Sequence, residues 1–427
     1  MMTREYKDSG IEWIGRIPKE WKTERIKALF SERNERDCQG RTLLSVSQYF
    51  GIRPKSETDL ADSHIAESYD DYKEVHKGDF VMNIMLAWNG SYAVSDYDGI
   101  VSPAYCVFKF RKNCCNKFFH YLLRTDGYPS AFKTLSRGVI DSRLRLYPEQ
   151  FYTFPIIFPP SGEQQRIADY LDKKCGEIDE LIALQEQMIA QLTDYKQSVI
   201  TEAVTKGLNP DAELVPSGID WIGDVPKGWK VNKVNRMFRV IGSGTTPNSS
   251  DDDAYIGTIN WLQSGDINGG ILTKANKRIS KETLVKYSAL SIYKAPFIIV
   301  AMYGASVGNI SISHIDACVN QACCVLGESA IDFTYAFYAI KSSQRYLIFR
   351  AVGGGQPNIS QYTLRQLWVP EPPISEQHAI ATYLDTKCSE IDSLIAIKQQ
   401  KIETLKDYKK SLVYEAVTGK MTIGETP

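Results

Sequence analysis

The sequence predicts a mixed α/β (α+β) protein in which two globular domains are joined by two long antiparallel coiled-coil helices, as a pseudo-two-fold internal duplication. A helical segment occurs twice, at 159–205 and 372–418, and most aligned positions of the two copies are identical. A shorter repeat opens each half, at 9–22 and 217–230. With 427 residues, the chain is also too long for one ordinary core.

The repeats divide the chain into two halves with the same organisation. We expect a globular domain, a helix, a second globular domain, and a second helix with a C-terminal tail, covering 1–158, 159–207, 208–371 and 372–427. Between the repeats, 23–158 and 231–371 look largely unrelated. Two similar scaffolds carrying different insertions indicate one task performed on two different targets.

Each helical copy has apolar residues at alternating spacings of three and four, which is typical of a coiled-coil seam. The seam residues are Leu171, Ile178, Ile182, Ile189 and Leu192 in the first copy, and Leu384, Ile391, Ile395, Ile402 and Leu405 in the second. Because duplicated units are often related by a two-fold axis, we infer antiparallel packing of the two helices. The alternative is that each helix packs on its own domain. Ser161 and Ser375 are the expected N-caps, and Gly207 and Gly419 the expected C-terminal ends.

The globular halves are predicted to contain short strands and many loops. Residues 77–94 and 294–312 each read as strand, turn and strand, and they align with each other, so we expect a shared fold. Polar or glycine-rich loops, 138–147 and 353–359, precede each long helix. Arg, Gln and Asn side chains of such loops can pair with base edges. Ordinary solvated loop residues are the alternative for each of them.

Charge is unevenly distributed along the chain, although the net charge is only −1. The globular regions are slightly basic, the helices are acidic, and 109–145 is strongly basic. This distribution permits a DNA-facing surface without requiring one.

Cysteine spacing and hydropathy bound the compartment. The nine cysteines form no C-x-x-C pair, which favours reduced thiols and predicts no metal site. The longest apolar run, about 295–305, is far too short to span a membrane. The opening MMTREYKDSG lacks an apolar signal core. We therefore expect a cytoplasmic protein without a membrane partner.

No catalytic centre is predicted. Residues 304–308, GASVG, match G-x-S-x-G, but the following NISISHID alternates like a strand, whereas a nucleophile elbow needs a helix. A tight turn is the simpler interpretation, and a serine hydrolase at Ser306 remains the enzymatic alternative. The chain also has no P-loop, and 353–355 lacks Rossmann spacing.

Several motifs carry a family resemblance over essentially the whole chain. Both halves open with SGIxWIGxxPxxW, and both helices read PPxxEQxxIAxYLDxKxxxID…DYKxSxxxEAVT. The second half adds GSGTTP, INWLQSGDI, AMYGASVGN, VNQA and GGGQPNIS, at 242–247, 259–267, 301–309, 319–322 and 353–360. In these motifs the chain resembles the specificity (S) subunit of Type I restriction–modification systems. The first half departs from the pattern, because it lacks the GGTP-like and SGDI-like motifs.

The resemblance implies a division of labour. Each globular region would be a target recognition domain that reads one half of a bipartite, gapped site in double-stranded DNA. The helices would be conserved spacers that set the gap and dock two methyltransferase (M) subunits, with restriction (R) subunits joining them. S-adenosylmethionine, ATP and Mg would be used by those partners, so this chain would be non-catalytic and without a cofactor.

Loop positions and side-chain chemistry select the candidate DNA contacts. They are Arg53, Trp88, Asn89, Arg137, Ser142 and Arg143 in the first half, and Thr245, Gln263, Tyr303, Ser306, Gln356 and Asn358 in the second. The alternative function is a pure scaffold whose globular halves bind proteins. Binding to duplex DNA that weakens steeply with salt would separate the two hypotheses.

Overall fold

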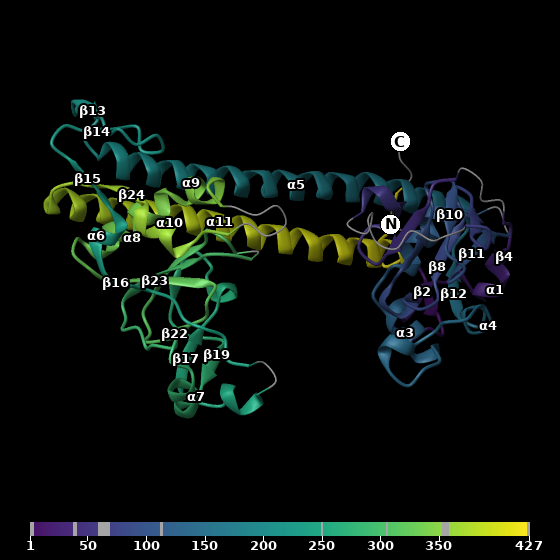
Figure 1. Ribbon diagram of the computed structural model, residues 1–427. Helices are drawn as coiled ribbons and strands as arrows, with labels where there is room; N and C mark the ends of the chain where they lie inside the picture. Colours follow the sequence, from purple (N-terminus) through teal and green to yellow (C-terminus); the bar gives the residue numbers. More distant parts are fainter. Residues whose placement is uncertain are drawn as a thin grey trace. The chain divides into compact units, whose positions relative to one another are not determined.

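The computed structural model describes residues 4–36, 41–58, 69–111, 114–248, 251–304, 306–351 and 358–424, without the side chains of Ser142 and Asp252. The chain forms two compact units, Met1–Glu186 with Gln400–Pro427 (unit 1) and Gln187–Gln399 (unit 2). The long helices α5 (Ser161–Lys206) and α11 (Ile374–Val417) each contribute one part to each unit (Figure 1).

Unit 1 is built on a four-stranded antiparallel sheet in the order β4-β11-β8-β9. Its strands are β4 (Phe30–Arg33), β8 (Phe80–Asn83), β9 (Tyr92–Val94) and β11 (Tyr105–Phe110). Alternate residues of a strand face opposite sides. Phe80 therefore stacks on Phe30 and Phe151, with ring centroids 5.1 and 5.7 Å apart, while Val81 packs with Val107 in a second cluster.

Short strand pairs and helices complete unit 1. The pairs are β1 (Tyr6–Asp8) with β2 (Arg16–Pro18), β3 (Lys22–Arg25) with β12 (Pro155–Phe158), β5 (Leu44–Ser47) with β6 (Gly51–Pro54), and β7 (Lys73–Val75) with β10 (Gly99–Val101). The helices are α1 (Ile26–Leu29), α2 (Asn116–Leu123), α3 (Gly127–Leu135) and α4 (Pro148–Phe151), with 3₁₀ turns η1 (Lys55–Glu57), η2 (Ala87–Asn89) and η3 (Asp141–Arg143). The β3–β12 pair places the opening repeat beside the segment that leads into α5.

Unit 2 repeats this sheet order in the five-stranded sheet β16-β23-β20-β21-β18. Its strands are β16 (Phe238–Gly242), β18 (Ile271–Leu272), β20 (Phe297–Ala301), β21 (Ile310–Ser313) and β23 (Cys323–Ser329). The first four positions correspond to β4, β11, β8 and β9, as the alignment of 77–94 with 294–312 predicted. The edge strand β18 pairs parallel to β21 and extends the sheet.

Unit 2 also carries a second sheet, in the order β19-β17-β22, from β17 (Ile259–Leu262), β19 (Lys277–Ile279) and β22 (Cys318–Val319). Two further pairs are β13 (Leu214–Pro216) with β14 (Asp224–Pro226), and β15 (Lys230–Lys233) with β24 (Trp368–Glu371). The helices are α6 (Val234–Met237), α7 (Lys281–Lys286), α8 (Phe333–Ser342), α9 (Gln344–Phe349) and α10 (Gln361–Gln366), with η4 (Asp252–Tyr255) and η5 (Ser264–Asp266).

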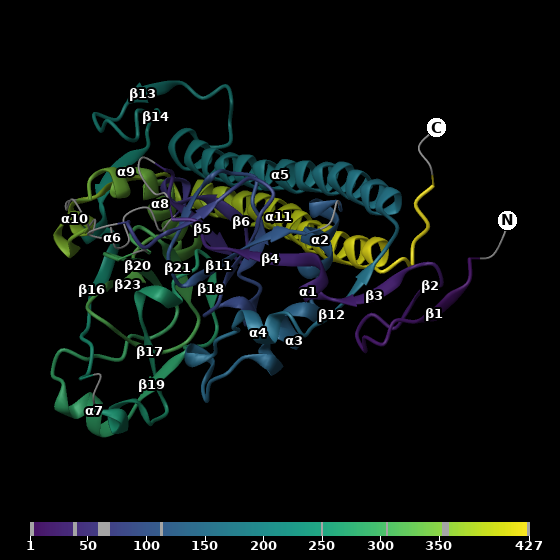
Figure 2. The same cartoon turned by 90° about the vertical axis from the view of Figure 1, so that its right-hand side faces the viewer.

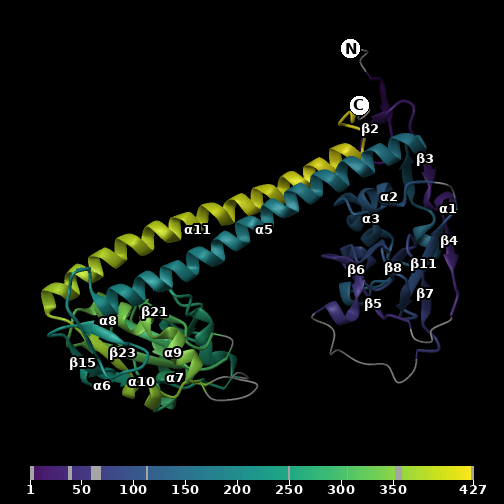
Figure 3. The same cartoon turned by 90° about the horizontal axis from the view of Figure 1, so that it is seen from above.

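In each unit α5 and α11 lie side by side and run in opposite directions (Figure 3). In unit 1, Lys409 Nζ contacts both carboxylate oxygens of Asp179 at 2.7 Å. In unit 2, Lys196 Nζ contacts those of Asp392 at 2.7 and 2.6 Å. The two lysines are aligned in the helical repeats, and so are the two aspartates. The helix pairing is therefore antiparallel and pseudo-two-fold.

The predicted seam residues lie on the sides of α5 and α11 that are buried or partly buried. Buried are Leu171, Ile178, Leu384, Ile391 and Ile402, and partly buried are Ile182, Ile189, Leu192, Ile395 and Leu405. Within the described ranges, no helix combines the length and the apolar character needed to cross a membrane.

The predicted serine N-caps are wrong. Helix α5 begins at Ser161 itself and α11 begins one residue before Ser375, so both serines lie inside their helices. The carbonyl oxygens of Pro160 and Pro373 accept the first helical N–H groups, with bonds of 2.9 and 3.0 Å in each helix. Pro160 and Pro373 are therefore the N-cap residues, because the carbonyl of an N-cap residue accepts the first intrahelical bond whatever its side chain is.

Both long helices end at a glycine that the opening repeat covers. Gly207 and Gly419 have φ values of 74° and 72°, in the left-handed region that favours glycine after a helix. A Cβ at Gly207 would lie 3.1 Å from the ring of Trp229, and one at Gly419 would lie 3.0 Å from the ring of Trp21. The repeated tryptophans thus close the helix ends.

Candidate nucleic-acid interface

In unit 1, residues of the helical motif hold the globular domain to α5. Trp21 Nε1 donates to Glu163 at 2.8 Å, and Tyr121 of α2 donates to Asp172 at 2.8 Å. The buried Gln164 side chain accepts from the N-cap residue of α2 at 3.1 Å and donates to the carbonyl of residue 159 at 2.7 Å. The Glu, Gln and Asp of the repeated helical motif therefore attach the globular domain to α5.

Unit 2 makes the same contacts with the aligned residues. Trp229 Nε1 donates to Glu376 at 3.1 Å, and the Tyr338 hydroxyl of α8 donates to an oxygen of its aspartate partner, residue 385, at 2.8 Å. Gln377 accepts from the N-cap residue of α8 at 2.9 Å and donates to the carbonyl of residue 372 at 2.7 Å. Both globular domains are thus attached to a long helix by equivalent contacts. This shared attachment leaves the loops of the two domains free to differ.

In unit 1, Lys133 of α3 joins two predicted contact regions. Its Nζ lies 5.1 Å from the ring centroid of Trp88 and donates to Asp141 Oδ2 at 2.9 Å. The N–H of Leu146 bonds to the carbonyl of Ile84, after β8, at 2.9 Å. We call Trp88, Lys133 and residues 137–145 the first loop cluster.

The predicted arginines of this cluster are free for contact with a ligand. Arg137 and Arg143 are exposed. The backbone of Arg137 pairs with that of Arg145 through two bonds of 2.9 Å, which holds the base of the loop. Ser142 belongs to η3, but its side chain lies outside the described residues.

Two other predicted DNA contacts of the first half, Asn89 and Arg53, make different kinds of contact. The Asn89 side chain accepts from the N–H and hydroxyl of Ser91, at 3.2 and 2.8 Å, so it shapes the turn after η2. Arg53 lies exposed on β6, with its guanidinium 5.7 Å from the ring centroid of Phe50. Among the described residues, the contacts of the first loop cluster therefore run through Trp88 and the 137–145 loop and do not include Arg53.

In unit 2, Gln321 is the centre of a second set of loops. Thr246 Oγ1 donates to Gln321 Oε1 at 2.6 Å, and Trp261 Nε1 donates to the carbonyl of Thr245 at 3.2 Å. The N–H of residue 320 bonds to the carbonyl of residue 262 at 2.9 Å, beside Gln263. Gln263 itself caps η5, and its N–H donates to a carboxylate oxygen of residue 266 at 2.9 Å.

Tyr303 and Asn358 join this set through an antiparallel β-bridge. The N–H of residue 359 donates to the carbonyl of Met302 at 2.6 Å. The N–H of Met302 donates to the carbonyl of residue 322 at 2.7 Å. Asn358 is exposed, Tyr303 is half-buried, and burial raises the pKa of its hydroxyl. Gln356 lies outside the described residues. We call the members the second loop cluster: Thr245, Thr246, Gln263, Tyr303, Gln321 and Asn358.

Ser306 lies in a tight turn between β20 and β21. Gly304 and Gly308 have φ values of 84° and 80°, and the Ser306 carbonyl accepts the N–H of Asn309 at 2.9 Å. The element that follows is a strand and not a helix, so the nucleophile-elbow interpretation is wrong.

Lys133, Gln321 and Thr246 were not among the predicted contacts. Lys133 was one of many basic residues in 109–145, and nothing local indicated that it contacts Trp88. Gln321 and Thr246 belong to the family-like motifs VNQA and GSGTTP, and the polar residues of those motifs were the available signal.

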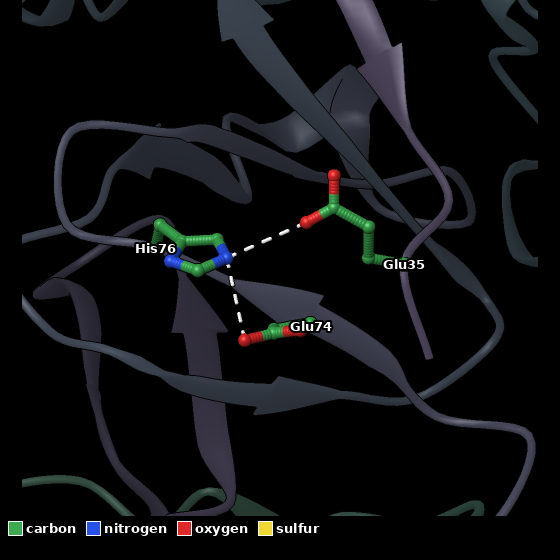
Figure 4. Close-up of side chains that lie close together, drawn as sticks. All are labelled: Glu35, Glu74 and His76. Carbon is green, nitrogen blue, oxygen red and sulfur yellow. Dashed lines mark ion pairs between the residues drawn. The ribbon is translucent and has the colours of Figure 1, made fainter. Parts of the chain in front are cut away.

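One group of described residues has the spacing of metal ligands (Figure 4). His76 Nε2 lies 3.5 Å from Glu35 Oε2 and 3.3 Å from Glu74 Oε1. The same two oxygens are already 2.6 Å from the guanidiniums of Arg33 and Arg41. Arg33 also lowers the pKa of Glu35 by hydrogen bonding. An ion would have to displace both arginines, so we interpret the group as an ion-pair network.

Known proteins share the architecture. The MjaVIII specificity subunit of Methanocaldococcus jannaschii is 23% identical over 96% of this chain and 94% of its own length. The EcoBI specificity subunit of Escherichia coli is 25% identical over 76% of this chain and 69% of its own. A solved chain described under complex assembly and conformational transition of the type I R-M system has a TM-score of 0.69 at 18% identity, covering 95% of this chain and 99% of that one.

A family model described as the type I restriction modification DNA specificity domain matches residues 18–194 and 226–407. The two matched stretches each contain one loop cluster and most of one long helix. With most of its length matched in this way, the chain belongs to the family of type I restriction–modification DNA specificity proteins.

Proposed function

We propose that this chain is the non-catalytic recognition subunit of a Type I restriction–modification complex and acts in the cytoplasm. Each globular domain reads one half of a bipartite, gapped DNA site. The observation that carries the proposal is that in both units a Trp, a Tyr and an N-cap backbone N–H of the globular domain bond to Glu, Asp and Gln side chains of a long helix, while the loop clusters differ. Two domains with the same attachment to the helices and different loops are suited to two half-sites of different sequence.

The loop chemistry supports a DNA ligand. The first loop cluster exposes Arg137 and Arg143, which can contact phosphates or guanine. The second exposes Asn358, Gln321 and Thr246, whose amide and hydroxyl groups can pair with base edges.

A domain swap tests the modular reading. Residues 23–158 are replaced by the corresponding region of another family member, and methylated motifs are mapped by single-molecule sequencing of host DNA. We expect one half of the methylated motif to change and the other half to stay. A change in both halves, or in neither, would show that the domains do not read separate half-sites.

The long helices set the gap between half-sites in this proposal, because each passes through both units. Seven residues inserted after Glu186 and seven after Gln399 preserve the seam and lengthen each helix by roughly 10 Å. The methylated motif should keep both half-sites and gain a gap longer by roughly three base pairs. An unchanged gap would exclude the spacer role.

The same helices offer two equivalent docking surfaces. In unit 1, Leu181, Leu184 and Tyr408 are exposed, and in unit 2 the aligned residues are also exposed, namely Leu394, Ile397 and Tyr195. Exposed apolar residues at matched positions indicate an interaction site. Two equivalent surfaces support our proposal that two methyltransferase subunits, with restriction subunits beyond them, assemble on this chain. S-adenosylmethionine, ATP and Mg would then belong to those partners.

Stoichiometry tests this assembly. Leu181→Glu and Leu394→Glu should each leave one methyltransferase bound, and the double variant none, in native mass spectrometry of the complex. Ala190→Glu is the matched control, because Ala190 is exposed and the aligned residue of α11 is already Glu403. Full binding by the double variant would place the docking surface elsewhere.

A further inference from the structure

The loop between α3 and α4 is held rigidly at its base. The backbones of Arg137 and Arg145 exchange two hydrogen bonds of 2.9 Å, and Leu144 and Leu146 are buried. Gly138 has a φ of 148°, and a Cβ there would lie 2.5 Å from the carbonyl oxygen of residue 143. The two strands of the loop therefore approach too closely for any side chain at Gly138.

The tip of this loop exposes two neighbouring aliphatic side chains. Val139 is 98% exposed and Ile140 is 54% exposed. Two hydrogen bonds hold the tip. The N–H of residue 143 donates to the Ile140 carbonyl at 2.8 Å, and Lys133 donates to Asp141. A clamped loop that points β-branched apolar residues into water needs an occupant that covers them.

Charge identifies the occupant. Along the sequence, the exposed Arg137 and Arg143 flank the aliphatic pair. Asp141 is the acidic residue between them, and its charge is balanced by Lys133 at 2.9 Å. A loop that exposes an apolar tip together with two arginines complements a DNA duplex, whose stacked bases are apolar and whose edges are lined by phosphates.

We propose that Val139 and Ile140 form a wedge that enters the DNA of the first half-site and partly separates two stacked base pairs, while Arg137 and Arg143 contact the flanking phosphates. This inference rests on the proposed DNA-recognition function and adds a mode of reading to it. A wedge favours base steps that unstack easily, such as pyrimidine–purine steps. Part of the first half-site is then read through deformability.

The experiment uses the full chain and a duplex that carries the methylated motif found by sequencing, with 2-aminopurine placed in turn at each position of the first half-site. Unstacking raises 2-aminopurine fluorescence. The wild-type chain should give a rise at one step. Val139→Ala/Ile140→Ala should lose that rise and bind the motif roughly tenfold more weakly. Its salt dependence should be unchanged, because no charge is removed.

Matched variants separate the wedge from the charges. Val285→Ala, at an exposed aliphatic residue of α7 in unit 2, should leave both fluorescence and affinity unchanged. Arg137→Ala and Arg143→Ala should each reduce the slope of log affinity against log salt by about one.

Each contrary result has its own meaning. If the wild-type chain binds the motif in preference to a scrambled duplex but no position brightens, the wedge is overturned and the recognition function stands. If it does not distinguish the two duplexes, both are overturned. If the double alanine variant keeps its DNA binding and instead loses a methyltransferase subunit, the loop is a protein contact and the wedge is again wrong.

Discussion

Gln164 connects the first globular domain with α5 through backbone groups on both sides. It is fully buried, and its amide is bonded to the backbones of residues 115 and 159 at 3.1 and 2.7 Å. Gln164→Leu leaves both backbone groups unpaired, which should destabilise unit 1 by about 3 kcal/mol. Hydrogen exchange read by mass spectrometry should show faster exchange at the start of α2.

The adjacent Gln165 provides the control. It is exposed and donates only along the helix, to Asp169 at 2.8 Å, in the bonds described for it. Gln165→Leu should leave exchange in α2 unchanged, and Gln377→Leu should transfer the effect to α8 in unit 2. Unchanged exchange in Gln164→Leu would mean that this glutamine does not anchor the domain.

His120 of α2 should make the stability of unit 1 depend on pH. Burial, and next the charge of Arg124, lower its pKa to about 4. The unfolded chain has a His pKa of about 6.5 and binds this proton first as pH falls. Stability is therefore complete above about 6.5 and is lost between there and about 4, by about 2 kcal/mol after allowance for partial exposure.

Urea unfolding of the full chain at several pH values checks this loss. His120→Gln should flatten the slope between about pH 6.5 and 4. His314→Gln, at an exposed residue of unit 2, should not change it. An equal slope in wild type and His120→Gln would assign the pH dependence to other groups.

At the same scale, single contacts were the hardest to predict. Arg137 and Asn358 are exposed, as expected for polar loop residues recognised locally, and their contact with DNA stays a prediction. Asn89 was chosen for the same reason, yet it bonds Ser91 and shapes its own turn. Lys133 was missed because its partner Trp88 is distant in sequence, and only folding brings the two together.

The lysines in the helix seam make the pairing of the long helices less stable than apolar residues at the same positions would. Lys196 and Lys409 occupy seam positions and pair with Asp392 and Asp179, whose carboxylates are largely exposed. Such exposed pairs contribute about 0.5 kcal/mol, less than a leucine would contribute in a seam. Replacing both lysines by leucine should therefore raise the melting temperature and weaken the choice of register.

Calorimetry of the full chain measures this change, and Lys401→Leu, outside the seam and exposed, is the control. A higher melting temperature together with mixed helix registers, seen by disulfide trapping across the seam, fits the argument. A lower melting temperature would mean that the ion pairs contribute more than exposed pairs usually do.

Helices were predicted better than their first residues. The three-four spacing extends over many turns, so the extents of α5 and α11 were predictable, and so were the closing glycines, which have the expected left-handed backbone. The serine N-caps failed because each helix begins earlier than predicted, so that the proline before each serine occupies the N-cap position and its carbonyl accepts the first helical N–H groups. A rule that looks for a capping side chain does not recognise a helix that starts after a proline.

For the whole molecule, the repeats predicted the duplication, and the aligned strands predicted the shared sheet. The way in which loops assemble was not predictable. The second loop cluster joins Thr246 to Gln321 and Tyr303 to Asn358, pairs that are far apart in sequence and lie in a region without a counterpart motif in the first half. The sequence motifs identified most residues of the second loop cluster. Only the fold showed that these residues lie close together.

The opening repeat meets a helix end in both units, once with a covalent link and once without. In unit 2, residues 208–216 connect α5 to the second repeat. In unit 1, the Tyr414 hydroxyl near the end of α11 donates to the carbonyl of Trp13 in the first repeat at 2.7 Å, and the hydroxyl of Tyr6, just before the repeat, donates to the Gly419 carbonyl at 3.1 Å. Strand β1 and the described segment that follows α11 lie on the same side of unit 1 (Figure 2). The same junction therefore forms without chain continuity.

A circular permutant tests this equivalence. Residue 424 is joined to residue 4 by a Gly/Ser linker of about ten residues, which reaches up to roughly 30 Å. New ends are opened at the exposed Pro210. The permutant should methylate the same motif with its partners and melt within a few degrees of the wild type, because both junctions keep their contacts. Opening the chain at Ala190 instead, inside α5, should abolish recognition. A Pro210 permutant that folds but methylates a different motif would show that continuity between α5 and the second repeat helps to position the second domain.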